Sequence, residues 1–461
     1  MLQNLGSSSY WHETSRRVPG PALTGRHDVD VAIVGGGYTG LWTAYQLRKA
    51  EPSMKVAVIE REVIGFGASG RNGGFAMTLL DMSLAHLRRN HGDAAAKAAH
   101  DAVAASVEEM GQAIAENDIE CEWKHGGLMV VATNRGQQQR VDRDLEAAEA
   151  LGLDGFTRLS REKAQAEVHS PTYVGGLREE HCAVVHPAKL VRGLARVVEG
   201  MGVDVFEGTD IETIDESGGK LRVISPKGVM YADQVVLATN AWAIETPWFQ
   251  KKVVPLYTYI AMTEPLTDEQ WATVGWESHC GIEDKRNYVH YYRRTLDGRI
   301  LWGGSDGIIP FRGRVSPRLD RNDKILERLT GTFRRTFPSS ATCGSPTTGA
   351  APWESPSTSC RSSGRSWRAG FTTASATTAT ASPPSHTGGK ILRDKVLGKP
   401  SELTELCIVD SKEPGFPPEP LRWIGGGLTR RALLRQDAQF DENRGGGEMD
   451  PLLLRVMKKL G

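Results

Sequence analysis

The sequence predicts an α/β fold into which a second region of antiparallel strands is inserted. Short β-branched runs alternate with helical patterns over much of the chain, and a glycine cluster separates the first such run from the first helix. Residues 250–305 instead read as successive strands with a short turn, which is typical of an antiparallel sheet. At 461 residues, the chain is long enough for two or three domains and a large core.

The charge balance and the cysteine pattern narrow the class of protein. Lys+Arg and Asp+Glu both number 56, so nothing predicts binding to nucleic acid or to an anionic membrane. The six cysteines form no CxxC pair, which favours reduced thiols over a disulfide framework or a zinc site. No run approaches the roughly 18 apolar residues of a spanning helix. The N-terminus has no apolar signal core either, so we expect a cytoplasmic protein with no integral membrane segment.

The first elements form a strand–helix–strand unit behind an N-terminal arm. Residues 1–28 are that arm, because Pro19 and Pro21 favour extended chain. The run "VDVAIVGGG" then predicts a buried strand, "TGLWTAYQLRKA" a helix, and "KVAVIE" a second buried strand. Residues 83–116, rich in Ala and Glu, predict one or two long helices.

The middle of the chain adds strands around two further helices. The run "CEWKHGGLMVVAT" is typical of a strand pair that turns at Gly126–Gly127, and a polar helix is expected near 135–151. The run "PAKLVRGLARVVEGMG" predicts an amphipathic helix with Pro187 in its first turn, where proline is favoured. Three more strands are predicted by "VDVFEGTDIETI", "KLRVISP" and "YADQVVLATN". A hairpin that turns at Asp297–Gly298 is predicted by "RNYVHYYRRTLDGRILWGG".

A glycine motif directly follows the first strand. Gly35, Gly37 and Gly40 form GxGxxG, and Glu60 ends the next strand, twenty residues after Gly40. In this context the spacing is typical of a Rossmann-type dinucleotide site, where the glycines allow a tight turn, an approach to a pyrophosphate and close helix packing. The Glu60 carboxylate would bind both ribose hydroxyls and repel a 2′-phosphate, which disfavours NADP. A structural turn in a nucleotide-free sheet is the alternative.

A second glycine-rich run distinguishes FAD from NAD. The run "GFGASGRNGGF", Gly65–Phe75, is too rich in glycine for a helix and too long for a simple turn. Its backbone N–H groups suit a close approach to the phosphates and ribityl chain of a flavin, with Arg71 and Asn72 as fixed donors. A solvent loop is the alternative. The later run "VVLATNAW" ends a buried strand with Ala238-Thr239-Asn240, which would return to the same nucleotide.

These glycine runs and two later segments resemble a known superfamily of flavoproteins. Together "GGGYTGL", "GFGASGRNGG", "VDVFEGT" and "ATNAW" are similar to the glycine/D-amino acid oxidase superfamily, and Gly65–Gly74 is most similar to the gamma-glutamylputrescine oxidoreductases. The resemblance covers nearly the whole chain except residues near 339–384. It implies FAD bound in extended form, with the ribose on Glu60, the adenine against the main chain of Val205, and the loop Ala68–Gly74 at the flavin end. The predicted cofactor-binding residues are Gly35, Gly37, Tyr38, Thr39, Gly40, Glu60, Arg61, Gly67, Ala68, Ser69, Arg71, Asn72, Gly73, Gly74, Val205, Ala238, Thr239 and Asn240.

The resemblance also implies a reaction, the oxidation of a C–N bond in an amine or amino acid. A hydride would pass to flavin N5, the imine would hydrolyse, and oxygen or another acceptor would reoxidise the flavin. No dedicated general base is needed if the amine binds neutral, so no catalytic residue is assigned. Gamma-glutamylputrescine, another polyamine derivative, a secondary amine such as sarcosine and a D-amino acid all fit as the small-molecule substrate.

His290, Tyr292 and Arg293 are the candidates for the substrate side. They lie with Tyr291 on a predicted strand, where alternate residues share a face, and members of the family tend to carry an aromatic–Arg pair here. Arg293 would bind a substrate carboxylate or, in the interpretation that we favour, pair structurally. His125 and His186 are interpreted as structural, and no metal ligands are predicted.

These elements divide the chain into two main domains. Residues 29–120, 180–245 and 385–400 are predicted to form a discontinuous, Rossmann-type FAD-binding domain. Residues 121–179 and 246–338 are predicted to form an interleaved, antiparallel-sheet substrate domain. Residues 401–461 are expected to form a C-terminal arm and helix.

Residues 339–384 do not fit the rest of the chain. These 46 residues contain no Ile, Leu, Val or Met, so they bury too little apolar surface to offset their conformational entropy. Read one nucleotide out of phase, "ASATTATASPP" (Ala374–Pro384) can encode G-V-G-Y-N-G-H-G-V-A-P, which contains a G-Y-x-G-H-G element that the family has here. We hypothesise that two compensating frame errors bracket this segment. A genuine Ser/Thr/Ala-rich insertion is the alternative.

Two other functions stay open at this point. An NAD-linked dehydrogenase would use the same nucleotide fold but would leave Gly65–Phe75 unexplained. The second alternative is a catalytically impaired pseudoenzyme. The resemblance implies that residues 339–384 lie beside the flavin ring and the substrate. A scrambled segment there would remove one wall of the pocket.

Overall fold

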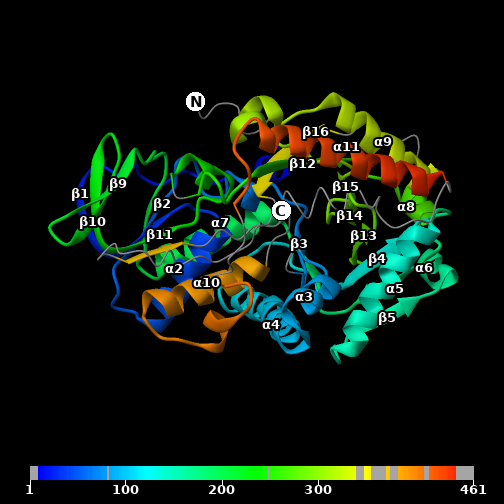
Figure 1. Cartoon of the computed structure of the whole chain (residues 1–461), viewed down its shortest axis with the longest axis horizontal. Helices are drawn as coiled ribbons and strands as arrows, with labels where there is room; N and C mark the ends of the chain where they lie inside the picture. Colours follow the sequence, from blue (N-terminus) through cyan, green and yellow to red (C-terminus); the bar gives the residue numbers. More distant parts are fainter. Residues whose placement is uncertain are drawn as a thin grey trace.

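The strands of the computed structural model form two large sheets that lie side by side along the longest axis of the molecule (Figure 1). Helices cover their faces, so the α/β architecture predicted from the sequence is confirmed. The structure describes residues 9–79, 82–247, 249–338, 347–354, 370–373, 383–409 and 415–442. Among the helices of these residues, none combines the length and apolarity needed to cross a membrane.

The first sheet carries the glycine motifs. Its strands follow the order β8-β2-β1-β11-β10-β9, with β17 beside β11. Strands β8, β2, β1 and β11 pair in parallel, which places their carboxyl ends at one edge, while β11, β10 and β9 form an antiparallel ribbon. Their bounds are β1 Gly25–Val34, β2 Val56–Ile59, β8 Asp204–Phe206, β9 Thr213–Ser217, β10 Lys220–Ile224, β11 Gly228–Leu237 and β17 Gly370–Thr373.

Helix α2 (Tyr38–Ala50) begins directly after the first strand and is buried along most of its length. It packs against helix α10 (Pro383–Val396), which approaches it closely at Gly389. A Cβ on Gly389 would lie 2.9 Å from the backbone carbon of Trp42. Helix α2 therefore has little freedom to move, and its N-terminus is held at the edge where the parallel strands end.

The second sheet is mainly antiparallel, with the order β16-β12-β15-β14-β13-β4-β6-β5. A strand pair that turns at Gly126–Gly127 was expected, but the residues before the turn contribute one isolated bridge, between Lys124 and Val184. The left-handed Gly127 (φ 73°) turns the chain before the strand begins. The bounds are β4 Leu128–Ala132, β5 Phe156–Leu159, β6 Gly175–Glu179, β12 Pro255–Met262, β13 Gly281–Asp284, β14 His290–Arg294, β15 Ile300–Gly304 and β16 Thr347–Glu354. A small third sheet pairs β3 (Phe75–Ala76) with β7 (Ala183–Val184).

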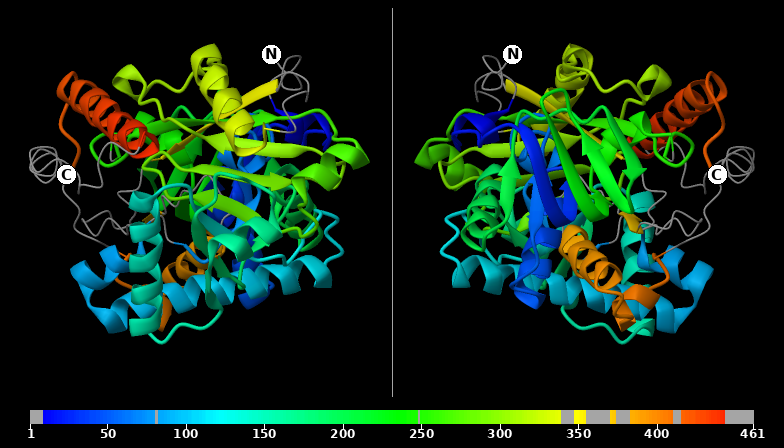
Figure 2. Two further views of the ribbon diagram at one scale, coloured as in Figure 1. Left: turned by 90° about the vertical axis from the view of Figure 1, so that its right-hand side faces the viewer. Right: turned by 90° about the vertical axis from the view of Figure 1, so that its left-hand side faces the viewer.

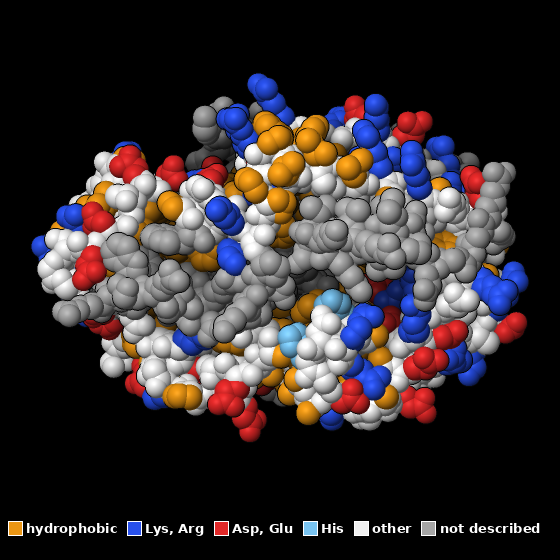
Figure 3. Space-filling model, viewed as in Figure 1, with side chains coloured by type: hydrophobic (Ala, Val, Ile, Leu, Met, Phe, Trp, Pro, Cys, Tyr) orange, Lys and Arg blue, Asp and Glu red, His pale blue; other side chains and the backbone are white. Residues whose placement is uncertain are grey.

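The remaining helices surround these sheets, as the two side views show (Figure 2). Residues 83–116 form two helices, as the sequence predicts. Exposed apolar side chains gather over the N-terminal part of α11 (Figure 3), among them Leu421, Trp423 and Leu428. The bounds are α1 Tyr10–Glu13, α3 Leu84–His91, α4 Asp93–Glu116, α5 Arg135–Ala150, α6 Arg161–Glu167, α7 Pro187–Gly200, α8 Asp268–Val274, α9 Asp323–Thr336 and α11 Leu421–Asp441.

Most of the anomalous segment lies outside the described residues. Within 339–384, the structure describes only the backbone of β16 and β17 and the first two residues of α10. The frame-error hypothesis therefore stays a prediction.

Candidate active site

A cavity of about 470 Å³ lies where the parallel strands β1, β2 and β11 end and helix α2 begins. This is the edge at which doubly wound sheets bind nucleotides. Twelve of the predicted cofactor residues line the cavity: Gly35, Gly37, Tyr38, Thr39, Glu60, Arg61, Gly67, Ala68, Ser69, Ala238, Thr239 and Asn240.

The first glycine motif is shaped by close backbone approaches. Gly35 has a φ of 117°, and a Cβ there would lie 2.3 Å from the carbonyl oxygen of Ala238. Gly37 is the residue before the first turn of α2, and a Cβ on it would lie 2.9 Å from Ser69 Oγ. Gly40 lies behind the cavity, where a Cβ would meet the carbonyl oxygen of Gly35 at 2.0 Å. Only glycine fits these contacts, so backbone N–H groups can face an anion at the helix N-terminus.

Glu60 closes the adjacent side of the cavity at the end of β2. Its carboxylate accepts hydrogen bonds from Gly36 N (2.8 Å) and Glu62 N (3.0 Å). Burial raises the pKa of this carboxyl, and the two backbone donors oppose the rise. The carboxylate is thus held in one orientation on the cavity wall, with lone pairs left for the hydroxyls of a bound ligand.

The opposite wall comes from the end of β11 and the turn after it. Thr239 Oγ1 is buried and has no hydrogen-bond partner among the described residues, so a polar ligand in the cavity would satisfy it. At the rim, Arg61 Nη1 lies 3.1 Å from Glu245 Oε2, and its guanidinium packs 5.3 Å from the Trp242 ring. Residues 209–214 also line the cavity, which the sequence did not predict, because this segment contains no glycine motif.

Several predicted cofactor residues lie outside this cavity. Asn72 is a turn residue that donates to Ala68 O and Ser69 O (both 3.1 Å) and accepts from Gly74 N (2.8 Å). Arg71 pairs with Asp320 at 3.0 Å. Gly73, Gly74 and Val205 do not line the cavity either. Beside Val205, the N-terminal arm bonds to the end of β8, where Pro21 O accepts from Glu207 N at 3.0 Å.

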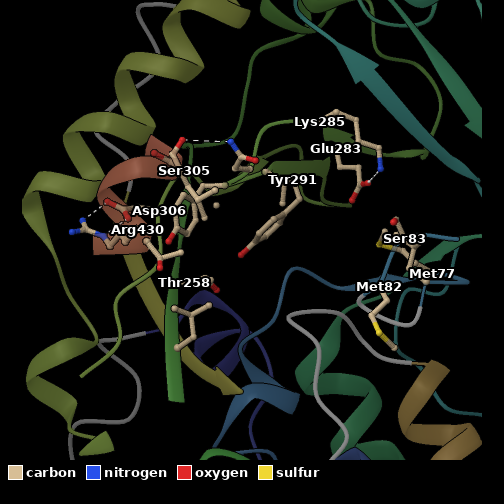
Figure 4. Close-up of a pocket in the computed structure, with 18 of the residues that line it drawn as sticks. Met77, Met82, Ser83, Thr258, Glu283, Lys285, Tyr291, Ser305, Asp306 and Arg430 are labelled. Atoms are coloured by element: carbon tan, nitrogen blue, oxygen red, sulfur yellow. Dashed lines mark hydrogen bonds and ion pairs between the residues drawn. The ribbon is translucent and has the colours of Figure 1, made fainter. Parts of the chain in front are cut away.

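A second cavity, of about 710 Å³, lies against one face of the second sheet (Figure 4). The register aligns Leu177, Val130, Glu283 and Tyr291 in one row across strands β6, β4, β13 and β14. All four residues line the cavity. Helix α11 contributes Arg430 to the opposite side, where it pairs with Asp306.

Tyr291 lies at the junction between the glycine loop and this sheet. Its ring packs edge-on to Phe75, with 6.0 Å between ring centroids. A Cβ on Gly73 would lie 3.0 Å from the ring, and one on Gly303 would lie 2.2 Å from it. Burial raises the pKa of Tyr291 to about 12, so the hydroxyl stays protonated. No described residue forms a conventional hydrogen bond with that hydroxyl, which points into the cavity (Figure 4).

The three substrate-side candidates are placed away from this cavity. His290 and Tyr292 face the core beneath the sheet, since residues two apart on a strand share a face. His290 Nδ1 lies 2.9 Å from Asp284, and Tyr292 donates or accepts a 2.7 Å hydrogen bond with Tyr173. Arg293 is buried and donates to Gly74 O (2.9 Å) and Val185 O (2.6 Å), which ties the glycine loop to the short link between β7 and helix α7. Burial lowers the pKa of Arg293 to about 10.

The sequence places Tyr291 on the same strand as these candidates, but nothing in the sequence singled it out. The alternation of the HYYR run allows either of two faces, and only the register of β14 against β13 determines which face meets the cavity. The structural role that we favoured for Arg293 agrees with its contacts to two carbonyl oxygens.

The chain belongs to a family of flavin enzymes. Residues 30–381 match the family described as FAD dependent oxidoreductase. The chain is 31% identical to the gamma-glutamylputrescine oxidoreductase of Escherichia coli over 345 residues, which cover 72% of this chain and 80% of that protein. It is 28% identical to the probable oxidoreductase OrdL of Haemophilus influenzae, over 64% of this chain and 69% of that one. The chain is thus an FAD-dependent oxidoreductase, as its sequence predicts.

Solved structures confirm the fold. The crystal structure of glycine oxidase from Geobacillus kaustophilus superposes with a TM-score of 0.68 and 18% identity, covering 84% of this chain and all of that one. The L-amino acid deaminase of Proteus myxofaciens superposes with a TM-score of 0.65 and 15% identity, covering 86% of this chain and 96% of that one. The first cavity fits FAD, because its glycine-lined helix N-terminus suits a pyrophosphate and Glu60 suits a ribose.

Proposed function

We propose that this protein oxidises the C–N bond of an amine that binds in the second cavity, using FAD held in the first. The observation that carries the proposal is the course of one segment. Gly65–Ser69 line the first cavity, and Phe75 and Met77–Leu79 line the second. A ligand in the second cavity therefore lies against the segment that shapes the cofactor site.

The proposed cofactor contacts follow from the first cavity. Gly35, Gly37 and the first turn of α2 would hold the pyrophosphate, Glu60 the ribose, and Thr239 a further polar group of FAD. When bound, FAD supplies the hydride acceptor for amine oxidation. The proposed role of Arg293 is to keep the loop that joins the two cavities in place.

The second cavity would orient an amine and exclude water. Phe75, Leu128 and Leu177 give it an apolar wall next to the loop. An apolar wall disfavours the ammonium form at the reacting nitrogen, so the amine would lose its proton and keep a lone pair. The Tyr291 hydroxyl is proposed to position that nitrogen by a hydrogen bond.

The charges in the second cavity favour an amine over an α-amino acid. A substrate carboxylate needs an unpaired cation, and the described cations of this cavity are paired. Arg430 lies 2.6 Å from Asp306, Arg422 lies 3.0 Å from Glu419, and Lys285 lies 2.8 Å from Asp144. The similarity to gamma-glutamylputrescine oxidoreductase supports a polyamine-derived substrate. Oxygen or another acceptor would reoxidise the flavin, and a cytoplasmic location stays a prediction.

A substrate panel with an artificial electron acceptor tests this function. The FAD-loaded chain is mixed with primary amines, sarcosine and D-amino acids, and reduction of the acceptor is followed together with release of a carbonyl product. We expect primary amines to react and α-amino acids to react far more slowly. Faster reaction with D-amino acids would contradict the proposal. FAD that binds but is reduced by no compound would favour the impaired enzyme.

A further inference from the structure

Two buried carboxylates lie on the wall of the second cavity. Glu179 ends β6 and Glu283 lies on β13, and both strands flank β4. The register places Glu179 opposite Leu128 and Glu283 opposite Val130, so both side chains share the face that lines the cavity. Their exposed fractions are only 2% and 8%. Buried carboxylates are rare in proteins unless cations balance them, and Lys285 is the one described cation in a salt bridge with this pair, which makes the pair a candidate site.

The local charges do not balance. Thr78 Oγ1 donates a hydrogen bond to Glu179, but no described Lys or Arg forms a salt bridge with it. Lys285 is shared between Asp144 (2.8 Å) and Glu283 (3.5 Å). Three carboxylates, Glu179, Glu283 and Asp144, thus line this wall, and the Lys285 ammonium contacts only the last two of them.

The pKa shifts agree with an unfilled cation site. Burial raises the pKa of Glu179, and the nearby charge of Glu283 raises it further. Burial also raises the pKa of Glu283, against the opposing charge of Lys285. A cation bound between the two carboxylates would lower both pKa values, so cation binding and protonation of the pair would exclude one another.

The position of the pair relative to Tyr291 defines what it can bind. Glu283 lies directly opposite Tyr291 in the antiparallel pairing of β13 with β14. Such cross-strand neighbours have Cβ atoms about 4.5–5.5 Å apart. Glu179 lies two strands beyond Glu283, on the far side of β4. A short alkyl chain with its reacting nitrogen near Tyr291 would therefore reach the carboxylates with its other end.

We propose that Glu179 and Glu283 form a subsite for a second, non-reacting ammonium group, so that the protein selects diamines over monoamines. This inference rests on the proposed amine oxidation and assigns the residues that determine its specificity. The second ammonium would donate charge-assisted hydrogen bonds to both carboxylates and restore the charge balance of the wall. The apolar residues between the subsite and Tyr291 would contact the alkyl chain.

The experiment compares two probes that differ by one charged group, diaminobutane and butylamine. Their dissociation constants are measured by calorimetry with the FAD-loaded wild type, Glu179→Gln and Glu283→Gln. Hydrogen bonds to charged groups contribute about 1.5–3 kcal/mol, so we expect wild type to prefer diaminobutane by about 10- to 100-fold. Each variant should shift the ratio of the two constants toward one. Glu180→Gln is the matched control, because Glu180 is adjacent in sequence but exposed.

Equal affinity of wild type for the two probes would overturn the subsite, as would an undiminished preference in both variants. Binding of neither probe would overturn it too. FAD content and the midpoint of thermal unfolding show whether each variant is folded. Because there are two variants, the test still works if one of them does not fold. Amine-dependent bleaching of the flavin is recorded in parallel. Bleaching by both amines with equal affinity would contradict the subsite alone, whereas no bleaching by either would contradict the proposed function.

Discussion

The first cavity is lined by backbone from short glycine-bearing segments, whereas the second is lined by side chains from strands far apart in the sequence. Gly35 and Gly37 have no side chain, which leaves room for close contacts with Ala238 and Ser69. Glu179, Glu283 and Tyr291 act through the atoms that they carry, and only strand register brings them together. The comparison teaches that the proposed cofactor site is a local property of the sequence, while the proposed amine site is a property of the folded sheet.

The largest effect is expected from residues 339–384, which the family resemblance places beside both ligands. The gene should be sequenced on both strands from Thr330 to Lys390. We predict two small compensating insertions or deletions and a true reading that contains G-Y-N-G-H-G. The corrected chain should turn over amines faster than the present one. A clean in-frame reading of the present sequence would contradict the prediction.

Gly35→Ala should abolish FAD binding. Its Cβ would overlap the Ala238 carbonyl oxygen, and the left-handed φ strains any other residue. Strain and overpacking cost about 1–3 kcal/mol each, so we expect about 1000-fold weaker FAD binding. The control is Gly331→Ala on α9, where a Cβ meets no atom within 4 Å. Absorbance of bound flavin near 450 nm reports the result. Retention of FAD by Gly35→Ala would show that this backbone does not form the site.

Gly303→Ala should slow flavin reduction by changing the second cavity, while FAD binding in the first cavity stays unchanged. The added Cβ would lie 2.2 Å from the Tyr291 ring, so that ring must move. A displacement of about 1 Å near the reacting atoms can cost about 100-fold in rate, and we expect a loss of that size in flavin reduction. Stopped-flow absorbance measures the rate, and FAD content should match wild type. An unchanged rate would remove Tyr291 from the amine site.

The sequence allowed the fold, the cofactor and most of the first cavity to be predicted, because strand–glycine–helix motifs are contiguous. Asn72 and Val205 stay predictions outside the lining of the first cavity, since a glycine-rich loop does not reveal which of its residues turn the chain and which face a ligand. The sequence placed Tyr291 on the candidate strand without singling it out, and it gave no sign of the carboxylate pair. Their positions depend on pairing between strands, and the alternation within one strand leaves the choice of face open.

Three buried histidines should make the folded protein less stable at acidic pH. Burial lowers the pKa of His12, His186 and His386 from 6.5 to about 3. One ring nitrogen of His12 accepts from Arg192 at 2.7 Å, and one of His186 accepts from the backbone of Lys189 at 3.2 Å, which keeps these rings neutral. Below pH 6.5 the unfolded chain binds more protons than the folded chain.

The contribution of these histidines to the free energy of unfolding is therefore fully present above pH 6.5. It is lost as the pH falls toward 3. The loss should be about 2 kcal/mol for each histidine near pH 5. Urea unfolding at a series of pH values measures it. His386→Gln should show a flatter dependence than wild type. Wild-type stability that does not change across this range would contradict the prediction.

Glu245→Gln should have the smallest effect. The pair that Glu245 forms with Arg61 lies at the rim of the first cavity, with exposed side-chain fractions of 56% and 33%. Exposed ion pairs contribute little, so we expect FAD affinity to change by less than about threefold. Equilibrium titration with FAD measures it. A tenfold change would mean that rim charge, as well as the glycine backbone, determines cofactor binding.

The most direct test of the account is a single turnover in the absence of oxygen. The FAD-loaded chain is mixed with one equivalent of diaminobutane, and the flavin absorbance near 450 nm is followed while the carbonyl product is measured. We predict bleaching of the bound flavin together with one equivalent of product for each flavin reduced. A flavin that stays oxidised with bound amine, or that is reduced without product, would contradict the claim that the two cavities form one active site.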